Sequence, residues 1–255
     1  MKKRIAAFLI LNLIVVTTMS FRQPKRIPTI WMIGDSTMCI YESTRAPITG
    51  WGMPFTTFFR KELNFQNRAK GGRSTRTFIT EGRWKPIADS LVAGDYVFMH
   101  FGHNDEAKEE KYRDRYTSVT DYKINLSKFI TEARQKSALP IVITPVSRMK
   151  FDSEGIALET HKEYTKAACE VAEQLKVPLI DLDKASRALF TQLGPERTKM
   201  LFMQIAPDVN PVYPEGQKDN THFNELGARM IAELVLHEIQ VQHLELTDYL
   251  YKPKK

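Results

Sequence analysis

Five short apolar runs are spaced along this chain, and Gly34, Gly102 and Pro145 stop three of them. Runs that stay apolar throughout, instead of alternating with polar residues, are typical of strands buried on both faces of a parallel sheet. The runs that predict strands are 27–33, 64–69, 96–101, 141–144 and 177–181.

Three longer segments between and after these runs have apolar residues at helical spacing. They cover 121–137, 159–175 and 224–240, and Asn224 is a suitable N-cap for the last one. The segment 207–216 contains three prolines and a glycine, which predicts a loop. Because strands alternate with helices, we predict an α/β fold whose parallel sheet carries helices on both faces.

The N-terminal segment has a different pattern. Residues 2–4 are basic, residues 5–16 are almost entirely apolar, and small residues follow before Phe21. This order is typical of a secretory signal peptide, and the apolar stretch is short for a membrane span. We therefore predict a signal peptide over residues 1–20, a single domain over residues 21–255, periplasmic or secreted localisation, and no stable membrane span after cleavage. An uncleaved N-terminal anchor is the alternative.

The composition is that of an ordinary folded domain, with 42% hydrophobic and 26% charged residues. The formal net charge is +7, and residues 2–4 carry three of these charges, so the chain without its signal peptide carries +4. No basic block of the kind that binds nucleic acid is present, although a modest positive charge suits the steering of an anionic substrate. Cys39 and Cys169 are too few for a disulfide framework, and we expect no bridge between them.

Four short polar peptides contain residues that acyl transfer needs, and three of them follow predicted strands. Ligands of open α/β sheets bind outside the carboxyl ends of the strands. Topology alone is therefore expected to bring the first three peptides to one edge of the sheet, whereas the fourth needs its loop to turn toward that edge. The residues of interest are Ser36, Gly72, Asn104, and the pair Asp219 and His222.

Ser36 is the candidate nucleophile, and a serine hydroxyl needs a base to remove its proton. His222 suits this role because Asp219, three residues earlier, can hold Nδ1 of the ring and leave Nε2 facing Ser36. We expect Asp219 and His222 to lie in a loop or in the opening turn of a helix. Two alternatives stay open: Ser36 is a helix cap or part of a phosphate-binding turn, and Asp208 replaces Asp219 as the acid.

The N–H of Gly72 and the side-chain amide of Asn104 are candidate donors to an oxyanion. His103 is a second histidine close to these residues, but we expect it to have a packing or substrate-contact role. The sequence has no His-Glu-x-x-His motif, no clustered cysteines and no glycine-rich nucleotide loop. No metal site or nucleotide site is therefore predicted.

In this order, the four peptides resemble the blocks of the SGNH or GDSL hydrolase superfamily, and most of all its rhamnogalacturonan acetylesterases of carbohydrate esterase family 12. Thr37, where the superfamily name has Leu, favours that branch, and the similarity covers about residues 26–241. The matching peptides are Gly-Asp-Ser-Thr at 34–37, Gly-Arg-Ser at 72–74, Phe-Gly-His-Asn-Asp at 101–105 and Asp-Asn-Thr-His-Phe at 219–223.

The resemblance implies a flavodoxin-like, three-layer α/β/α sandwich. It also implies a serine esterase that removes acetyl groups from pectic polysaccharide through an acetyl-enzyme, with no metal and no organic cofactor. The roles that it implies are Ser36 as nucleophile, His222 as base, Asp219 as orienting acid, and an oxyanion hole made by the N–H groups of Ser36 and Gly72 and by the Asn104 amide.

Several cationic residues and one tryptophan are candidates for contacting the substrate. Guanidinium groups suit galacturonate carboxylates and an indole suits the face of a sugar, although a solvated charged surface is the alternative. We expect the partner to be an acetylated polysaccharide or oligosaccharide and the protein to be a monomer. The rival functions are an esterase of the same superfamily acting on xylan or another acylated molecule, and a non-catalytic glycan-binding module. The candidate contact residues are Arg73, Arg76, Arg83, Trp84, His103 and Arg148.

Overall fold

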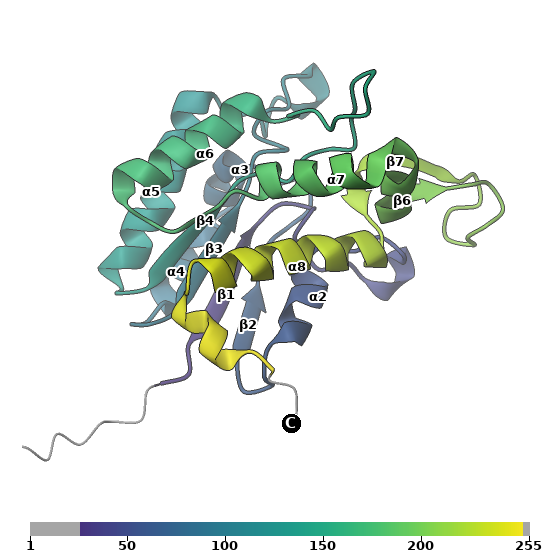
Figure 1. Cartoon of the computed structure of the whole chain (residues 1–255). Coiled ribbons are helices and arrows are strands. Elements are labelled where there is room, and N and C mark those ends of the chain that lie inside the picture. Colours follow the sequence, from purple (N-terminus) through teal and green to yellow (C-terminus); the bar gives the residue numbers. More distant parts are fainter. Residues whose placement is uncertain (1–25, 252–255) are drawn as a thin grey trace, which may run out of the picture.

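A five-stranded parallel sheet forms the centre of the structure, a computed structural model that describes residues 26–251 (Figure 1). The predicted signal peptide, residues 1–20, lies outside the described residues. The strands are β1 Thr29–Gly34, β2 Asn64–Asn67, β3 Tyr96–His100, β4 Leu139–Ile143 and β5 Leu179–Ile180. Their order, β2-β1-β3-β4-β5, is that of a flavodoxin-like sheet.

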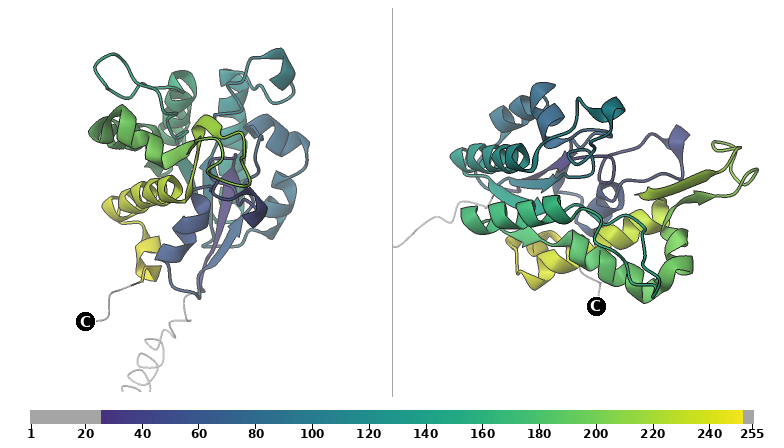
Figure 2. Two further views of the ribbon diagram at one scale, coloured as in Figure 1. Left: turned by 90° about the vertical axis from the view of Figure 1, so that its right-hand side faces the viewer. Right: turned by 90° about the horizontal axis from the view of Figure 1, so that it is seen from above.

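Helices cover both faces of this sheet, which confirms the predicted three-layer α/β/α sandwich (Figures 1 and 2). One face packs against α2, α7 and α8, and the other against α3, α4, α5 and α6. The helices are α2 Gly52–Phe55, α3 Thr75–Thr80, α4 Trp84–Ser90, α5 Val119–Gln135, α6 Lys162–Leu175, α7 Leu182–Thr198 and α8 Glu225–Val241.

The alternation of side chains along β3 shows how one strand serves both cores. Phe98 points toward the α2 side and lies 5.8 Å from Phe55, ring centroid to ring centroid. Val97 and Met99 point to the opposite side, where they share a core with Phe129 of α5. All residues of β3 are buried, because a strand in the middle of a covered sheet has no face left for water.

The strands and the three helices expected from the sequence are all present, with ends that differ by a few residues. Asn224 caps α8, since its side chain accepts a hydrogen bond from the N–H of Gly227 at 3.0 Å. The sequence pattern did not predict α2, α3, α4 or α7. In α7 the regular pattern is broken by Gly194, which has a φ of 74°, and by Pro195.

A separate two-stranded antiparallel sheet, β6 Phe202–Ile205 and β7 Gln217–Phe223, lies beside the central sheet (Figures 1 and 2). The predicted loop 207–216 joins the two strands. Phe202 pairs with Phe223, but Met203 pairs with Asp219, so residues 220–222 bulge out of the ladder. The expectation that Asp219 and His222 lie in a loop or a helical turn is therefore wrong: both belong to β7, with Asp219 directly before this bulge and His222 within it.

Cys39 is buried and Cys169 is half-buried, and both are free, as expected. Within residues 26–251, no helix combines the length and the apolar character needed to cross a bilayer.

Candidate active site

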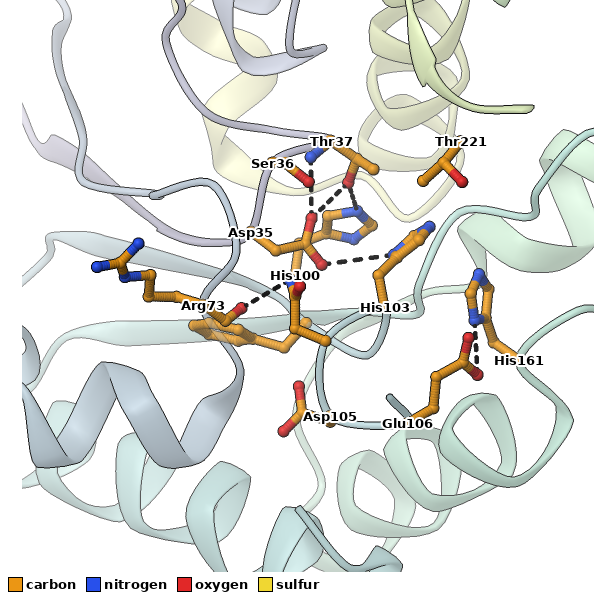
Figure 3. A network of polar contacts seen from close by, with 12 residues as sticks. Asp35, Ser36, Thr37, Arg73, His100, His103, Asp105, Glu106, His161 and Thr221 are labelled. Atoms are coloured by element: carbon orange, nitrogen blue, oxygen red, sulfur yellow. Dashed lines mark hydrogen bonds and ion pairs between the residues drawn. The ribbon is translucent and has the colours of Figure 1, made fainter. Parts of the chain in front are cut away.

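Ser36 lies in the turn that directly follows β1, and neighbouring side chains fix this turn. Oδ1 of Asp35 accepts hydrogen bonds from the N–H of Thr37 at 2.9 Å and from its hydroxyl at 2.8 Å (Figure 3). The Thr37 hydroxyl also lies 2.9 Å from Nε2 of His100, at the end of β3. On the other side, the hydroxyl of Tyr41 donates to the carbonyl of Ser36 at 3.0 Å. The backbone of Ser36 is thus held from two directions.

The bulge of β7 brings His222 to Ser36. Nε2 of His222 lies 2.9 Å from Oγ of Ser36, and Nδ1 lies 2.7 Å from Oδ2 of Asp219. The other oxygen of Asp219 accepts hydrogen bonds from the N–H of Thr221 at 2.7 Å and of His222 at 3.0 Å. Burial raises the pKa of Asp219, but its interactions with His222 outweigh burial and hold the pKa below the ordinary 3.8. The carboxylate is therefore ionised at neutral pH and can orient the ring.

Gly72 and Asn104 reach the same site from the ends of β2 and β3. Gly72 has a φ of +78°, a conformation that favours glycine, and it lines a groove together with Ser36 and Asn104. Asn104 is 7% exposed; its Nδ2 donates to the carbonyl of Arg73 at 3.1 Å, and its Oδ1 accepts from Nη1 of Arg115 at 2.8 Å. An amide has two N–H groups, so one remains available to an oxyanion.

A buried polar network lies behind the Ser36 turn (Figure 3). Nδ1 of His103 is 3.4 Å from Oδ2 of Asp35, and its ring lies against that of His161, with centroids 4.2 Å apart. Burial, with a contribution from His161, lowers the pKa of His103 to about 3, so this ring is neutral at neutral pH. His103 also lines the groove beside Ser36. It is thus mainly a packed residue with one edge near the site.

Arg148 holds the bulge of β7 in place. Its guanidinium donates to the hydroxyl of Thr221 at 2.6 Å and to Oε1 of Glu106 at 2.9 Å. The other oxygen of Glu106 lies 3.0 Å from Nδ1 of His161. Next in the chain, the N–H of Met149 donates to the carbonyl of Asn220 at 2.8 Å. Arg148 therefore lines the groove beside Ser36, but its guanidinium is already paired with the carboxylate of Glu106.

Two grooves meet at Ser36. One has a volume of about 440 Å³ and is lined by residues that follow β3 and β4. The other, of about 450 Å³, is lined by residues that follow β1 and β2. The residues common to both are Ser36, Asn104, Arg115 and His222. A substrate larger than a single acetyl group has room to extend on either side of Ser36.

The three arginines predicted near the second strand do not point into these grooves as free cations. Nε of Arg73 lies 3.0 Å from Glu81, and its Nη1 donates to the carbonyl of Gly71 at 2.9 Å. Arg83 also pairs with Glu81 and lines a different hollow, next to Trp31. Arg76 is exposed and donates to the carbonyl of Tyr116 at 3.2 Å.

The prediction that Trp84 offers its face to a sugar at this site is wrong. Its side chain is 3% exposed and packs against Phe129, with ring centroids 4.9 Å apart. Its indole N–H donates to Glu132, away from Ser36. Trp84 is the first residue of α4, and its large apolar ring is needed in the core beneath that helix.

Arg115 is the main site residue that the sequence did not predict. It contacts Asn104 and lies over the ring of Tyr112, 3.8 Å from the centroid. It belongs to the irregular segment before α5, where neither apolar periodicity nor a motif marks any residue. Asp208, the alternative acid, lies in the connection between β6 and β7, whereas Nδ1 of His222 contacts Asp219.

The arrangement is chemically suited to acyl transfer, since a hydroxyl, a base held by an acid, and available N–H donors converge. No cluster of His, Cys, Asp and Glu suitable for a metal ion is found within residues 26–251.

Comparisons with known proteins agree on one family. The model of the GDSL-like lipase/acylhydrolase family matches residues 32–230. Rhamnogalacturonan acetylesterase RhgT of Bacillus subtilis is 38% identical over 221 residues, which are 87% of this chain and 93% of that protein. The probable rhamnogalacturonan acetylesterase YesY of the same organism is 37% identical over 228 residues, 88% of this chain and 98% of that protein. The crystal structure of Bacillus subtilis YxiM has a TM-score of 0.74 and 32% identity, and the match covers 88% of this chain but 59% of that one.

Asp105, next to Asn104, gives a testable consequence of burying charge at the site. It has no exposed surface; one carboxylate oxygen accepts from the N–H and the hydroxyl of Thr75, at 2.9 and 2.5 Å. Burial raises its pKa from 3.8 to about 7. The folded state therefore favours the protonated acid, and this contribution to stability is lost as the pH rises toward 7.

We expect Asp105→Asn, which keeps an acceptor for Thr75 but cannot ionise, to lessen the fall in stability between pH 4 and pH 7. The difference in the free energy of unfolding between Asp105→Asn and wild type should change by up to about 1.4 kcal/mol per pH unit in that range. Free energies of unfolding from denaturant titrations at several pH values measure it, with the exposed Asp114→Asn as control. Parallel curves for Asp105→Asn and wild type would refute the raised pKa.

Proposed function

The chain belongs to the GDSL-like lipase/acylhydrolase family of esterases, and we propose that it is a carbohydrate O-acetylesterase acting on pectic polysaccharide of the rhamnogalacturonan type. The observation that carries the proposed mechanism is the chain of contacts from Ser36 through His222 to Asp219. The similarity to RhgT and YesY, over most of each protein, supports the choice of substrate.

In the proposed reaction, Nε2 of His222 takes the proton of Ser36 as Oγ attacks the acetyl carbon. The bond from that carbon to the sugar oxygen breaks, and the sugar oxygen takes the proton from His222, which leaves an acetyl-enzyme. Water then attacks the acetyl carbon while His222 takes one of its protons. The bond from that carbon to Oγ breaks, His222 returns the proton to Oγ of Ser36, and the product leaves as acetic acid, which ionises to acetate. Asp219 holds the ring in its tautomer and offsets the positive charge that the ring gains in each step.

The negative charge on the carbonyl oxygen would be stabilised by the N–H groups of Ser36 and Gly72 and by Nδ2 of Asn104. Arg115 contributes through Asn104: its guanidinium, 2.8 Å from Oδ1, keeps the amide oriented and polarises it. A polarised amide is a stronger donor, because hydrogen bonds in a chain strengthen one another.

We further propose that the protein is exported to the periplasm or the medium and acts as a monomer. The basic, apolar and small-residue pattern of residues 1–20 supports export.

Acetate release from a panel of esters tests the proposed function. We expect wild type to release acetate from acetylated rhamnogalacturonan oligosaccharides faster than from acetylated xylo-oligosaccharides, and to cleave long-chain acyl esters poorly. Ser36→Ala should lose nearly all turnover on every ester, because the nucleophile is absent, while its melting temperature stays close to that of wild type. A preference for xylan or for long acyl chains would contradict the proposed substrate, and residual turnover of Ser36→Ala near the wild-type rate would contradict the nucleophile.

The donor role of Asn104 predicts a loss in kcat. Asn104→Ala should lower kcat about a hundredfold or more and change KM little, because an oxyanion forms only in the transition state. Arg115→Ala alone should lower kcat by less than Asn104→Ala does. Added to Asn104→Ala, it should lower kcat hardly any further, because Arg115 acts through the amide of Asn104. Steady-state kinetics of the four proteins measure this coupling, with the exposed Arg113→Ala as control. Additive losses would show that Arg115 does not act through Asn104.

Export predicts a mature protein that begins at Phe21. Expression of the full chain in a bacterial host, followed by mass spectrometry of the periplasmic and secreted fractions, measures the N-terminus. An intact chain that begins at Met1 and stays with the membrane fraction would favour the uncleaved anchor instead.

A further inference from the structure

Positive charge is concentrated in one of the two grooves at Ser36. The groove of about 450 Å³, here called the basic groove, is lined by Arg45, Lys70 and Arg115 and by a single acid, Glu42. Within residues 26–251, neither Arg45 nor Lys70 forms an ion pair. Two cations without acidic partners therefore line a groove that reaches the nucleophile.

The opposite groove has no such excess. Its two arginines, Arg115 and Arg148, are matched by Glu106 and Glu109, and Arg148 pairs directly with Glu106 at 2.9 Å. Arg73 and Arg83 are not free cations either, because both form ion pairs with Glu81. A ligand carboxylate would have to displace these acids, whereas Arg45 and Lys70 are available without breaking an ion pair.

Arg45 is also held in position relative to Ser36. Its guanidinium lies over the ring of Tyr41, 5.0 Å from the centroid, and its carbonyl accepts from the hydroxyl of Tyr213 at 2.9 Å. The hydroxyl of the same Tyr41 binds the carbonyl of Ser36. One tyrosine thus contacts both the cation and the backbone of the proposed nucleophile.

Lys70 is held through its backbone on the other wall of the groove. Its N–H donates to the carbonyl of Gly34 at 3.0 Å, at the end of β1, and Gly71 and Gly72 follow it directly. The side chain is exposed, so its ammonium group can reach a bound anion without being desolvated first.

We propose that the basic groove binds a carboxylate group of a uronic acid in the substrate, with Arg45 and Lys70 as its ligands. The inference rests on the proposed function, because it assumes that the ester is carried by an acidic polysaccharide. A guanidinium binds a carboxylate through two parallel hydrogen bonds, and an ammonium group adds a compact charge. Arg115 is not included, since it is bound to Asn104. The acidic sugar then lies on the Gly71–Gly72 side of Ser36.

The first experiment compares an acidic substrate with a neutral ester in the same preparations. For Arg45→Gln/Lys70→Gln, the ratio of kcat/KM on acetylated galacturonate-containing oligosaccharides to kcat/KM on 4-nitrophenyl acetate should fall at least about tenfold, the loss expected for charged hydrogen bonds. Lys70→Gln alone should move the ratio in the same direction. The control Lys85→Gln/Arg113→Gln removes two charges that line neither groove at Ser36, and it should leave the ratio unchanged. An unchanged ratio in Arg45→Gln/Lys70→Gln, here called the groove variant, would overturn the proposal.

The second experiment does not depend on which polymer is deacetylated. Unacetylated galacturonate oligomers should inhibit the hydrolysis of 4-nitrophenyl acetate by wild type, and xylo-oligosaccharides of equal length should inhibit much less. The inhibition constant should rise at least about tenfold in Arg45→Gln/Lys70→Gln, and at high salt the inhibition should weaken in wild type.

The two experiments separate the two proposals. Inhibition that is lost in the groove variant supports the carboxylate site even if wild type releases no acetate from pectic oligosaccharides, a result that would overturn only the proposed substrate. Wild type that is not inhibited by galacturonate oligomers, or a groove variant inhibited as strongly as wild type, would overturn the carboxylate site.

Discussion

The contact between Ser36 and His222 joins two separate sheets, and much of the surrounding structure fixes its two ends. Ser36 follows a strand of the central sheet, whereas His222, 186 residues later, lies in the bulge of β7. Backbone hydrogen bonds hold the bulge from both ends, since the N–H of Met149 donates to the carbonyl of Asn220 in the bulge and the N–H of Thr49 donates to the carbonyl of Phe223 directly after it. Because hydroxyl and imidazole are already positioned, little freedom remains to be lost when an ester binds.

The sequence predicted the part of the site that depends on the central sheet. Ser36, Gly72 and Asn104 each follow a parallel strand, and parallel strands deliver their carboxyl ends to one edge. The setting of His222 could not be predicted in the same way. It depends on a register shift between Phe202 and Met203 in the pairing of β6 with β7, and this shift leaves no periodicity in the local sequence. Helix α7 was not predicted either. It consists of two helical pieces that meet at a kink, because Gly194 has a non-helical φ of 74° and Pro195 follows it.

The candidate substrate-contact residues show a different limit of sequence reasoning. A cation near a motif can be counted from the sequence, but whether it is free depends on which acid the fold places beside it. Arg73 and Arg83 face Glu81, and Trp84 is drawn into the core, whereas Arg45 and Lys70, which no pattern marked, remain without an acidic partner among the described residues. Exposed ion pairs contribute little to stability. A cation in such a pair nevertheless has less charge available to attract an anionic ligand. Pairing therefore decides which cations can recognise a substrate.

The wall behind Ser36 is polar although it is as deeply buried as the apolar cores on either side of the sheet. Asp35, His100 and Asp105 have no exposed surface, and burying such groups costs free energy unless hydrogen bonds offset it. Apolar burial has no preferred direction, whereas hydrogen bonds specify direction, as those from Thr37 to Asp35 do. We infer that stability and orientation come from different parts of the molecule: the apolar cores hold the sheet together, and the polar wall, at some cost in stability, holds the turn of Ser36 at the angle that His222 requires.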